Sequence, residues 1–113
     1  MWNTINTEKD IKYLMEQVCE FHDACIKEMI YYSGAYVTEE LSMYPVNEQR
    51  EVRLIILRQD ENIPAVELAF QDIVFFYVSP TSTAYTCEIL GARLYFKDER
   101  IYWSNSDDPI TMA

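Results

Sequence analysis

The stretch TEKDIKYLMEQVCEFHDACIKEMIYY, residues 7–32, decides the fold because its hydrophobic period changes partway along. In its first half the apolar residues recur at spacings of three and four, which is the pattern of an amphipathic helix. This stripe consists of Ile11, Leu14, Met15 and Val18. Thr7 is placed to accept a hydrogen bond from the amide of residue 10, as a helix N-cap does. We therefore predict one helix over about 7–22, with His22 in the buried stripe and Cys19 at its margin.

After Asp23 the composition becomes β-branched and aromatic, and the rest of the chain alternates in the manner of strands separated by polar turns. Residues 34–49 fit either a short strand or a long loop. The predicted strands cover about 24–33, 50–59, 65–70, 73–79, 85–91, 92–97 and 101–104. The sequence thus predicts a single α+β domain over 1–113, with the helix on one face of a twisted antiparallel meander of five to seven strands. A partly closed barrel is a variant of this fold.

The chain is strongly acidic, and this limits its possible partners. Its 113 residues include 19 acidic and 9 basic side chains, which gives a formal net charge of −10. Such a surface repels phosphates, so we expect neither nucleic-acid binding nor docking on anionic lipid, whereas a basic protein would be attracted. The polar start and the absence of an apolar run of about 18 residues predict a cytoplasmic protein without a leader or a membrane span.

One short pattern resembles a known group of proteins. The segment FHDACI, Phe21 to Ile26, leads from the helix into a strand, and a later strand contains Leu68, Phe70 and Ile73 in an L-x-F-x-x-[IV] step. Together with the order of elements, this resembles small uncharacterised bacterial proteins, some of whose relatives resemble immunity proteins of polymorphic toxin systems. The resemblance implies an α+β fold and a binding role, and it brings no catalytic residues with it.

A zinc site is the first chemical alternative, because Cys19, His22, Cys25 and Cys87 supply the ligand types of a tetrahedral centre. The spacing disfavours it, since Cys19 and His22 are predicted to lie on a continuing helix instead of a tight knuckle. We expect no metal and no cofactor, and we expect the three cysteines to be reduced, buried thiols.

Catalysis is also disfavoured by the pattern of charges. Cys19 and His22 would come within reach on a helix, but the neighbouring carboxylates disfavour the thiolate that a nucleophile needs. Glu67 and Glu88 each lie in the middle of a predicted strand, where pairing with Arg53, Arg58 or Arg93 across strands is the expected role. We therefore expect a protein that is not an enzyme.

Phe21, His22 and Asp23 are interpreted as a structural hinge. A histidine on the apolar face near a helix C-terminus can satisfy both ring nitrogens locally, and Asp23 can accept hydrogen bonds from amides at the turn. These residues would then fix the point where the helix becomes a strand.

Binding is the remaining role, and tyrosine is the residue type that favours it. Nine tyrosines occur against five phenylalanines, and tyrosine and arginine are common anchors of protein interfaces. The candidate partner-binding residues are Tyr36, Tyr44, Arg93, Tyr95 and Tyr102. We hypothesise an acidic protein-binding module, with an immunity protein that neutralises a toxin by occlusion as the concrete form. A small-molecule or metal site near His22 and a homodimer formed through a strand edge are the alternatives.

Overall fold

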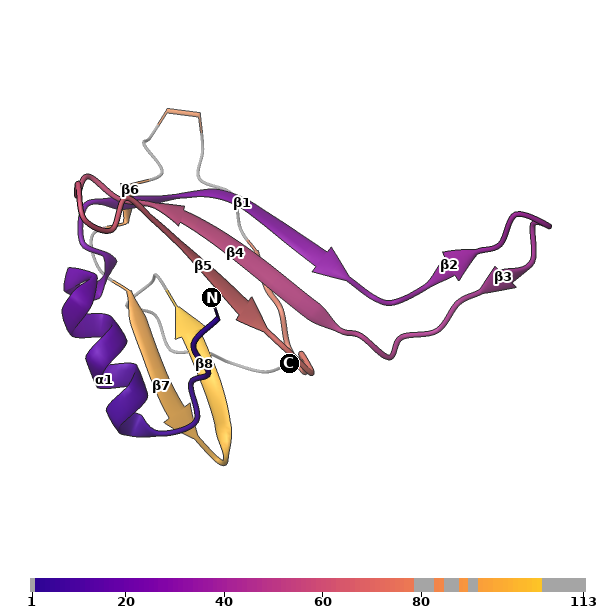
Figure 1. Cartoon of the computed structure of the whole chain (residues 1–113), viewed down its shortest axis with the longest axis horizontal. Helices are drawn as coiled ribbons and strands as arrows, with labels where there is room; N and C mark the ends of the chain where they lie inside the picture. The colour runs from indigo at the N-terminus through magenta and orange to yellow at the C-terminus, as the bar shows by residue number, and fades with distance from the viewer. Residues whose placement is uncertain (1, 79–82, 85–87, 90–91, 105–113) are drawn as a thin grey trace.

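The computed structural model describes residues 2–78, 83–84, 88–89 and 92–104, and it confirms the α+β class (Figure 1). The helical elements are α1 (Glu8–Gln17) and the short η1 (Cys19–Phe21). The strands are β1 (Ala24–Tyr32), β2 (Tyr36–Val37), β3 (Met43–Tyr44), β4 (Glu51–Leu57), β5 (Ala65–Phe70), β6 (Glu88–Ile89), β7 (Arg93–Lys97) and β8 (Arg100–Ser104).

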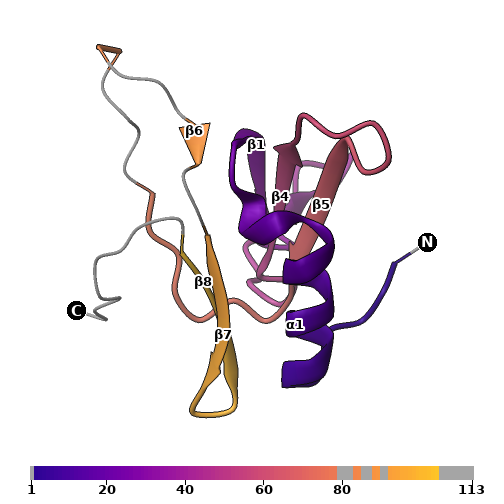
Figure 2. The same ribbon diagram turned by 90° about the vertical axis from the view of Figure 1, so that its left-hand side faces the viewer.

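The strands form one four-stranded sheet and two ribbons. The sheet has the order β5-β4-β1-β6 and all its pairs are antiparallel, while β2 pairs with β3 and β7 pairs with β8. Strands β1, β4 and β5 are the predicted meander, and β6 joins the other side of β1 at Ala24 and Cys25. No barrel closes within the described part of the chain. Helix α1 contacts β7, and α1 and the β7–β8 ribbon lie together beside the sheet (Figure 2).

Helix α1 begins where the sequence predicts. The amide of Asp10 donates to Thr7 Oγ1 over 3.2 Å, and the amide of Thr7 donates back to Asp10 Oδ2 over 3.1 Å, which completes a capping box. The amide of Asn6 also donates to Asp10 Oδ2. These hydrogen bonds hold the pKa of Asp10 below its ordinary value, the bond from Asn6 contributing most.

The predicted C-terminal end of the helix, at residue 22, is wrong. The α-helix ends at Gln17, and Cys19, Glu20 and Phe21 then have φ angles of 52°, 55° and 58°. Three successive residues with positive φ make a left-handed turn, which reverses the direction of the chain before β1. Because of this turn His22 leaves the buried stripe, and its side chain is 60 % exposed. Phe21 takes the buried position instead.

Phe21 is the centre of the hydrophobic core. Its side chain is fully buried and meets the ring of Trp103 edge-on at a centroid distance of 5.2 Å. Around it lie other buried residues from the helix, the sheet and the start of the β7–β8 ribbon. They are Val18, Ala24, Leu54, Ile56, Ile89 and Ala92. The turn, the helix and the strands are therefore held together by one cluster of apolar contacts.

Strand β4 is covered on one face, although its apolar sequence predicts two covered faces. Val52, Leu54 and Ile56 are buried, whereas Ile55 is half-buried and Leu57 is exposed on the other side. The cause is the arrangement of the elements, because α1 contributes its apolar stripe to the cluster that contains Leu54 and Ile56.

Two other strand predictions differ from the structure. Residues 73–78 form no strand, because Asp72 has a φ of 54° and directs the chain away from β5, and Ile73 instead donates its amide to the carbonyl of Arg50. Residue 79, residues 85–87 and residues 90–91 lie outside the described residues. The hairpin turn at Asp98 and Glu99 has two residues with φ of 51° and 63°, so it is the two-residue turn with positive φ and not the longer loop suggested by its lack of glycine.

The ambiguous residues 34–49, together with Ser33, form a hairpin arm. Gly34 has a φ of 97° at its base, and a β-carbon there would lie 3.2 Å from Gln49 Cβ, so glycine allows the two sides to approach. The amide of Gln49 donates to the carbonyl of Ser33 at the same point. The arm is therefore a continuation of the β1–β4 hairpin.

We predict opposite effects from one substitution at two nearby glutamates. Glu20→Gly should stabilise the protein by about 0.5–1 kcal/mol, because a left-handed residue with a β-carbon costs about 1–2 kcal/mol and glycine's extra chain entropy offsets only part of this. Glu16→Gly, in the regular helix, should destabilise by about 0.5–1 kcal/mol. Urea denaturation measures the free energy of unfolding of both variants. A loss of stability in Glu20→Gly as well as in Glu16→Gly would contradict a left-handed conformation at Glu20.

The core position of Phe21 predicts a contrast with its neighbour. Phe21→Ala should lower the free energy of unfolding by about 3–5 kcal/mol, because it leaves a cavity against Trp103. His22→Ala should cost less than about 1 kcal/mol, since most of its side chain is in solvent. Chemical denaturation gives the free energy of unfolding of the two variants. Equal losses of stability would mean that His22 contributes as much as Phe21 to holding the helix against β1.

The capping box predicts a specific pH dependence. The pKa of Asp10 is lower in the folded state than in the unfolded state, so its contribution to stability is present above the unfolded pKa of about 3.9 and is lost as pH falls through the folded value. Asp10→Asn should therefore be less stable than the parent at pH 7 and approach it at low pH. Urea titrations of the parent and the variant at pH 7 and at low pH measure this difference in stability, with Glu16→Gln as the control. A difference between parent and Asp10→Asn that is the same at both pH values would contradict the prediction.

Candidate protein-binding surfaces

The arm, defined as residues 33–49, projects away from the rest of the molecule (Figure 1). Its most exposed large apolar side chains are between 45 and 84 % exposed, and they are Tyr36, Val37, Leu41, Met43 and Tyr44. The chain has a radius of gyration of 16.1 Å, against about 13 Å for a compact domain of this length. Apolar side chains gathered on a projecting element are typical of an interaction surface.

Tyr36 and Tyr44 are directly opposite each other in the arm. They are cross-strand partners in the β2–β3 ribbon, and their rings stack at a centroid distance of 4.9 Å with planes 10° apart. Both were predicted as partner-binding residues from sequence. A two-stranded ribbon is only marginally stable alone, so this stacking stabilises the arm as well as presenting two phenol groups to solvent.

Leu41 lies in the turn at the end of the arm and was not predicted from sequence. Its φ is 66°, and its side chain is 84 % exposed, the largest value among the exposed large hydrophobic residues described. The amide of Leu41 donates to the carbonyl of Thr38, and the amide of Ser42 donates to Thr38 Oγ1. A branched apolar residue in a left-handed conformation costs energy and gains little burial at this exposure, so no contact among the described residues favours leucine at this position.

The arm is also uniformly acidic. Residues 33–49 contain Glu39, Glu40 and Glu48 and no lysine or arginine. Each of the three glutamates is exposed. The arm therefore combines apolar anchors with negative charge, which suits a partner surface that is itself basic.

The remaining predicted residues lie on the β7–β8 ribbon. Tyr95 and Tyr102 are cross-strand partners, stacked at 5.4 Å with planes 12° apart, and the guanidinium carbon of Arg93 lies 5.7 Å from the centre of the Tyr95 ring. Lys97 and Arg100 are cross-strand partners in this ribbon. Lys97 is two residues from Tyr95, so both basic side chains lie on the same face of the ribbon as the two tyrosines. We call these five side chains the basic face.

The structure separates the predicted residues into two groups. Tyr36 and Tyr44 lie on the arm, and Arg93, Tyr95 and Tyr102 lie on the ribbon beside α1, at the opposite end of the molecule (Figure 1). Alternation along β7 and β8 puts Leu94 and Trp103 on the other side of the ribbon. The sequence could not indicate the distance between the two hairpins.

The alternative site near His22 has no supporting geometry in the described residues. His22 Nε2 lies 3.5 Å from Asp23 Oδ2, both side chains being more than half exposed. Cys19 is exposed, which corrects the prediction of a buried thiol, and Cys25 is half-buried. No three His, Cys, Asp or Glu side chains within the described ranges could hold a metal ion. Cys87 lies outside those ranges.

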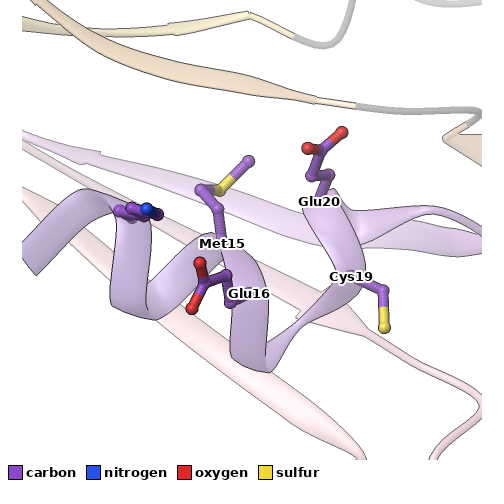
Figure 3. A pocket seen from close by; sticks show the side chains of 5 residues that line it. Met15, Glu16, Cys19 and Glu20 are labelled. Carbon is purple, nitrogen blue, oxygen red and sulfur yellow. The ribbon is translucent and has the colours of Figure 1, made fainter.

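Two shallow depressions flank the end of α1. The first, of about 420 Å³, is lined by Lys12, Met15, Glu16, Cys19 and Glu20. Figure 3 shows the Cys19 sulfur and the Glu20 carboxylate on opposite sides of the turn, so they do not converge on a common point. The second, of about 620 Å³, shares Met15 and Glu20 and is also lined by Ala92, Arg93, Leu94, Tyr95 and Lys97. His22 lines neither depression.

A cluster around Arg53 was only partly predicted. Arg53 NH1 lies 3.6 Å from Glu67 Oε1, as expected from the strand pattern, but Arg53 Nε also donates to Glu51 Oε2 over 3.2 Å. The guanidinium lies 5.5 Å from the Trp2 ring and 5.7 Å from the Tyr32 ring. Glu51 is 6 % exposed, and its hydrogen bond raises the pKa of Arg53. This cluster attaches the N-terminal segment to the sheet.

Arg58 and Glu88 were also predicted to form ion pairs across strands. Arg58 pairs with Asp60 at 3.6 Å instead of with a strand glutamate, and Asp60 accepts the amides of Asn62 and Ile63 in the β4–β5 turn. These amides lower the pKa of Asp60, Asn62 contributing most. The side chain of Glu88 lies outside the described residues.

No described helix is long and apolar enough to cross a membrane.

Comparison with other proteins does not assign this chain to a family. No family model matches the chain, and no curated protein or solved structure resembles it significantly.

Proposed function

We propose that this chain is a non-covalent protein-binding module whose arm docks on a basic partner. Neutralisation of a toxin by occlusion is the concrete form of this proposal. The observation that carries it is Leu41, an apolar side chain held in solvent at the tip of an acidic arm. The intramolecular contacts described above give no reason for a leucine in this conformation, whereas insertion into an apolar pocket of a partner would.

The chemistry of the arm supports a partner with a cationic surface. Glu39 and Glu40 directly precede Leu41, so an inserted tip would bring two carboxylates next to an apolar anchor. Basic residues at the rim of a pocket would pair with these carboxylates, while Leu41 would fill the pocket. The net charge of −10 would accelerate the encounter with such a partner.

Occlusion follows from the shape of the molecule. The longest dimension is 48 Å, and it runs along the direction in which the arm projects (Figure 1). A projecting arm can enter a cleft that the body of the domain cannot. If the cleft binds an anionic substrate, the arm excludes that substrate both by its volume and by its charge.

The test is binding of the purified protein to the purified product of the neighbouring toxin gene, measured by titration calorimetry. We expect association that weakens as the salt concentration rises from about 0.1 to 0.5 M, because contact between opposite charges is screened. Leu41→Asn should weaken binding about tenfold or more, as loss of a buried apolar anchor does. Its thermal midpoint should be unchanged or higher, because asparagine tolerates positive φ better.

Tyr13→Ser is the matched control, since Tyr13 is an exposed aromatic residue on α1, away from the arm. It should leave the affinity unchanged. Absence of any association at 0.1 M salt would end the toxin version of the proposal. Association that Leu41→Asn leaves unaffected would show that the arm is not the binding element.

A further inference from the structure

We propose that, without another partner, the arm of one molecule docks on the basic face of a second copy, and that two copies exchange arms reciprocally. This self-association goes beyond the proposed function, because it assigns an occupant to the arm within solutions of the pure protein. It also gives a role to the second group of tyrosines, which the proposed function leaves unused.

Complementary charge identifies the second copy as the occupant. The arm has three glutamates and no basic residue, whereas the basic face has Arg93, Lys97 and Arg100. These three are a third of the nine basic residues in a chain with 19 acids. The two acids of the ribbon, Asp98 and Glu99, lie in its turn and not on its strands. Opposite charges are thus concentrated on two hairpins of an otherwise acidic protein.

The apolar components of the two surfaces also match. Each carries one stacked pair of cross-strand tyrosines, Tyr36 with Tyr44 on the arm and Tyr95 with Tyr102 on the ribbon. Tyr95 and Tyr102 are half-buried and leave part of each ring accessible. Tyrosine rings contribute a large contact area with few rotatable bonds, and basic side chains beside them pack favourably on other aromatic rings.

The contact must be made between two molecules. In Figure 1 the arm projects from one end of the sheet, and the β7–β8 ribbon lies beside α1 at the other end. The arm is anchored to the sheet through β1 and β4, which pair over their length, so it cannot fold back onto its own ribbon. Only another copy can bring a basic face to the arm.

The available area favours reciprocal exchange. A stable dimer buries about 800 Å² on each partner. The arm offers two partly covered tyrosines, at about 150–250 Å² each when fully buried, and three smaller apolar side chains, which together fall short of this area. One arm alone is therefore too small. When each copy supplies an arm and a basic face, the interface reaches the required size and closes with two-fold symmetry.

A different dimer would use the free edge of β1. Strand β6 pairs only with Ala24 and Cys25, so in the described part of the chain the edge from Ile26 to Tyr32 has no partner strand. That contact would be made by backbone hydrogen bonds and would not involve the basic face. It would not weaken with salt, and this separates it from the exchange of arms.

The first experiment is sedimentation velocity of the purified full chain over a concentration series. At about 0.1 M salt the repulsion between two acidic bodies is already screened beyond about 10 Å, so only close contacts remain sensitive to added salt. We expect a monomer–dimer equilibrium whose dissociation constant rises as salt is raised to about 0.5 M. Tyr36→Ser with Tyr44→Ser should raise it about tenfold or more, and Tyr13→Ser should not.

The decisive experiment is an exchange of charges. One variant carries Lys97→Glu and Arg100→Glu, and the other carries Glu39→Lys and Glu40→Lys. Each alone should remain monomeric, because its arm and basic face then have the same sign. An equal mixture should form a heterodimer, because both contacts are again between opposite charges. All four substitutions are at exposed positions, and circular dichroism verifies that each variant folds.

Three results would overturn the proposal. They are a monomer at every concentration, a dimer that salt strengthens or leaves unchanged, and charge variants that dimerise alone or fail to associate when mixed. All three results come from the purified chain alone, without a toxin. A negative result for self-association therefore does not bear on toxin binding, which the calorimetric titration tests, and a negative titration does not bear on the proposed dimer.

Discussion

The left-handed turn at Cys19, Glu20 and Phe21 is the constraint on which the rest of the structure depends. It redirects the chain from α1 to β1 and places Phe21 in the core. Three residues in this conformation cost about 1–2 kcal/mol each, and burial of one aromatic side chain returns about 1.5–3 kcal/mol. Backbone hydrogen bonds contribute the rest, since the amide of Ala92 donates to the Glu20 carbonyl and the amide of Asp23 donates to the Ile89 carbonyl. The turn is therefore stable only when β6 and β7 are in place beside it.

This dependence explains which parts of the fold could be predicted from the sequence. Local patterns identified the Thr7 cap and the alternating strands that became β4, β5, β7 and β8, because each is determined by residues close in the chain. The left-handed turn has no glycine or asparagine to indicate it. Its conformation is imposed by residues about 70 positions later, near Ile89 and Ala92, and a single sequence contains no local signal of such contacts. His22 was consequently placed in the core instead of Phe21.

The arm was not predicted for a related reason. Its residues read equally well as strand or loop, because its two strands have only two residues each and no third strand in the described part of the chain pairs with them. What maintains it is the tyrosine stack, the Thr38 turn and the close approach at Gly34. A tyrosine-rich segment at an uncertain position predicted binding, but not that Leu41 would be its most exposed apolar residue. That exposure results from the position of Leu41 in the turn that Thr38 closes.

The separation of charge between the two hairpins would make the two proposed contacts of the arm unequal in strength. The basic face offers three cationic side chains next to the two acids of its own turn, on a body that is negative overall. A basic partner would offer the same kind of contact without that repulsion, so under the proposed function the arm would bind it more strongly than it would bind a second copy. The proposed self-association would then cover the exposed tyrosines and Leu41 while no partner is present, and a partner would displace it, because both contacts would use the same side chains of the arm.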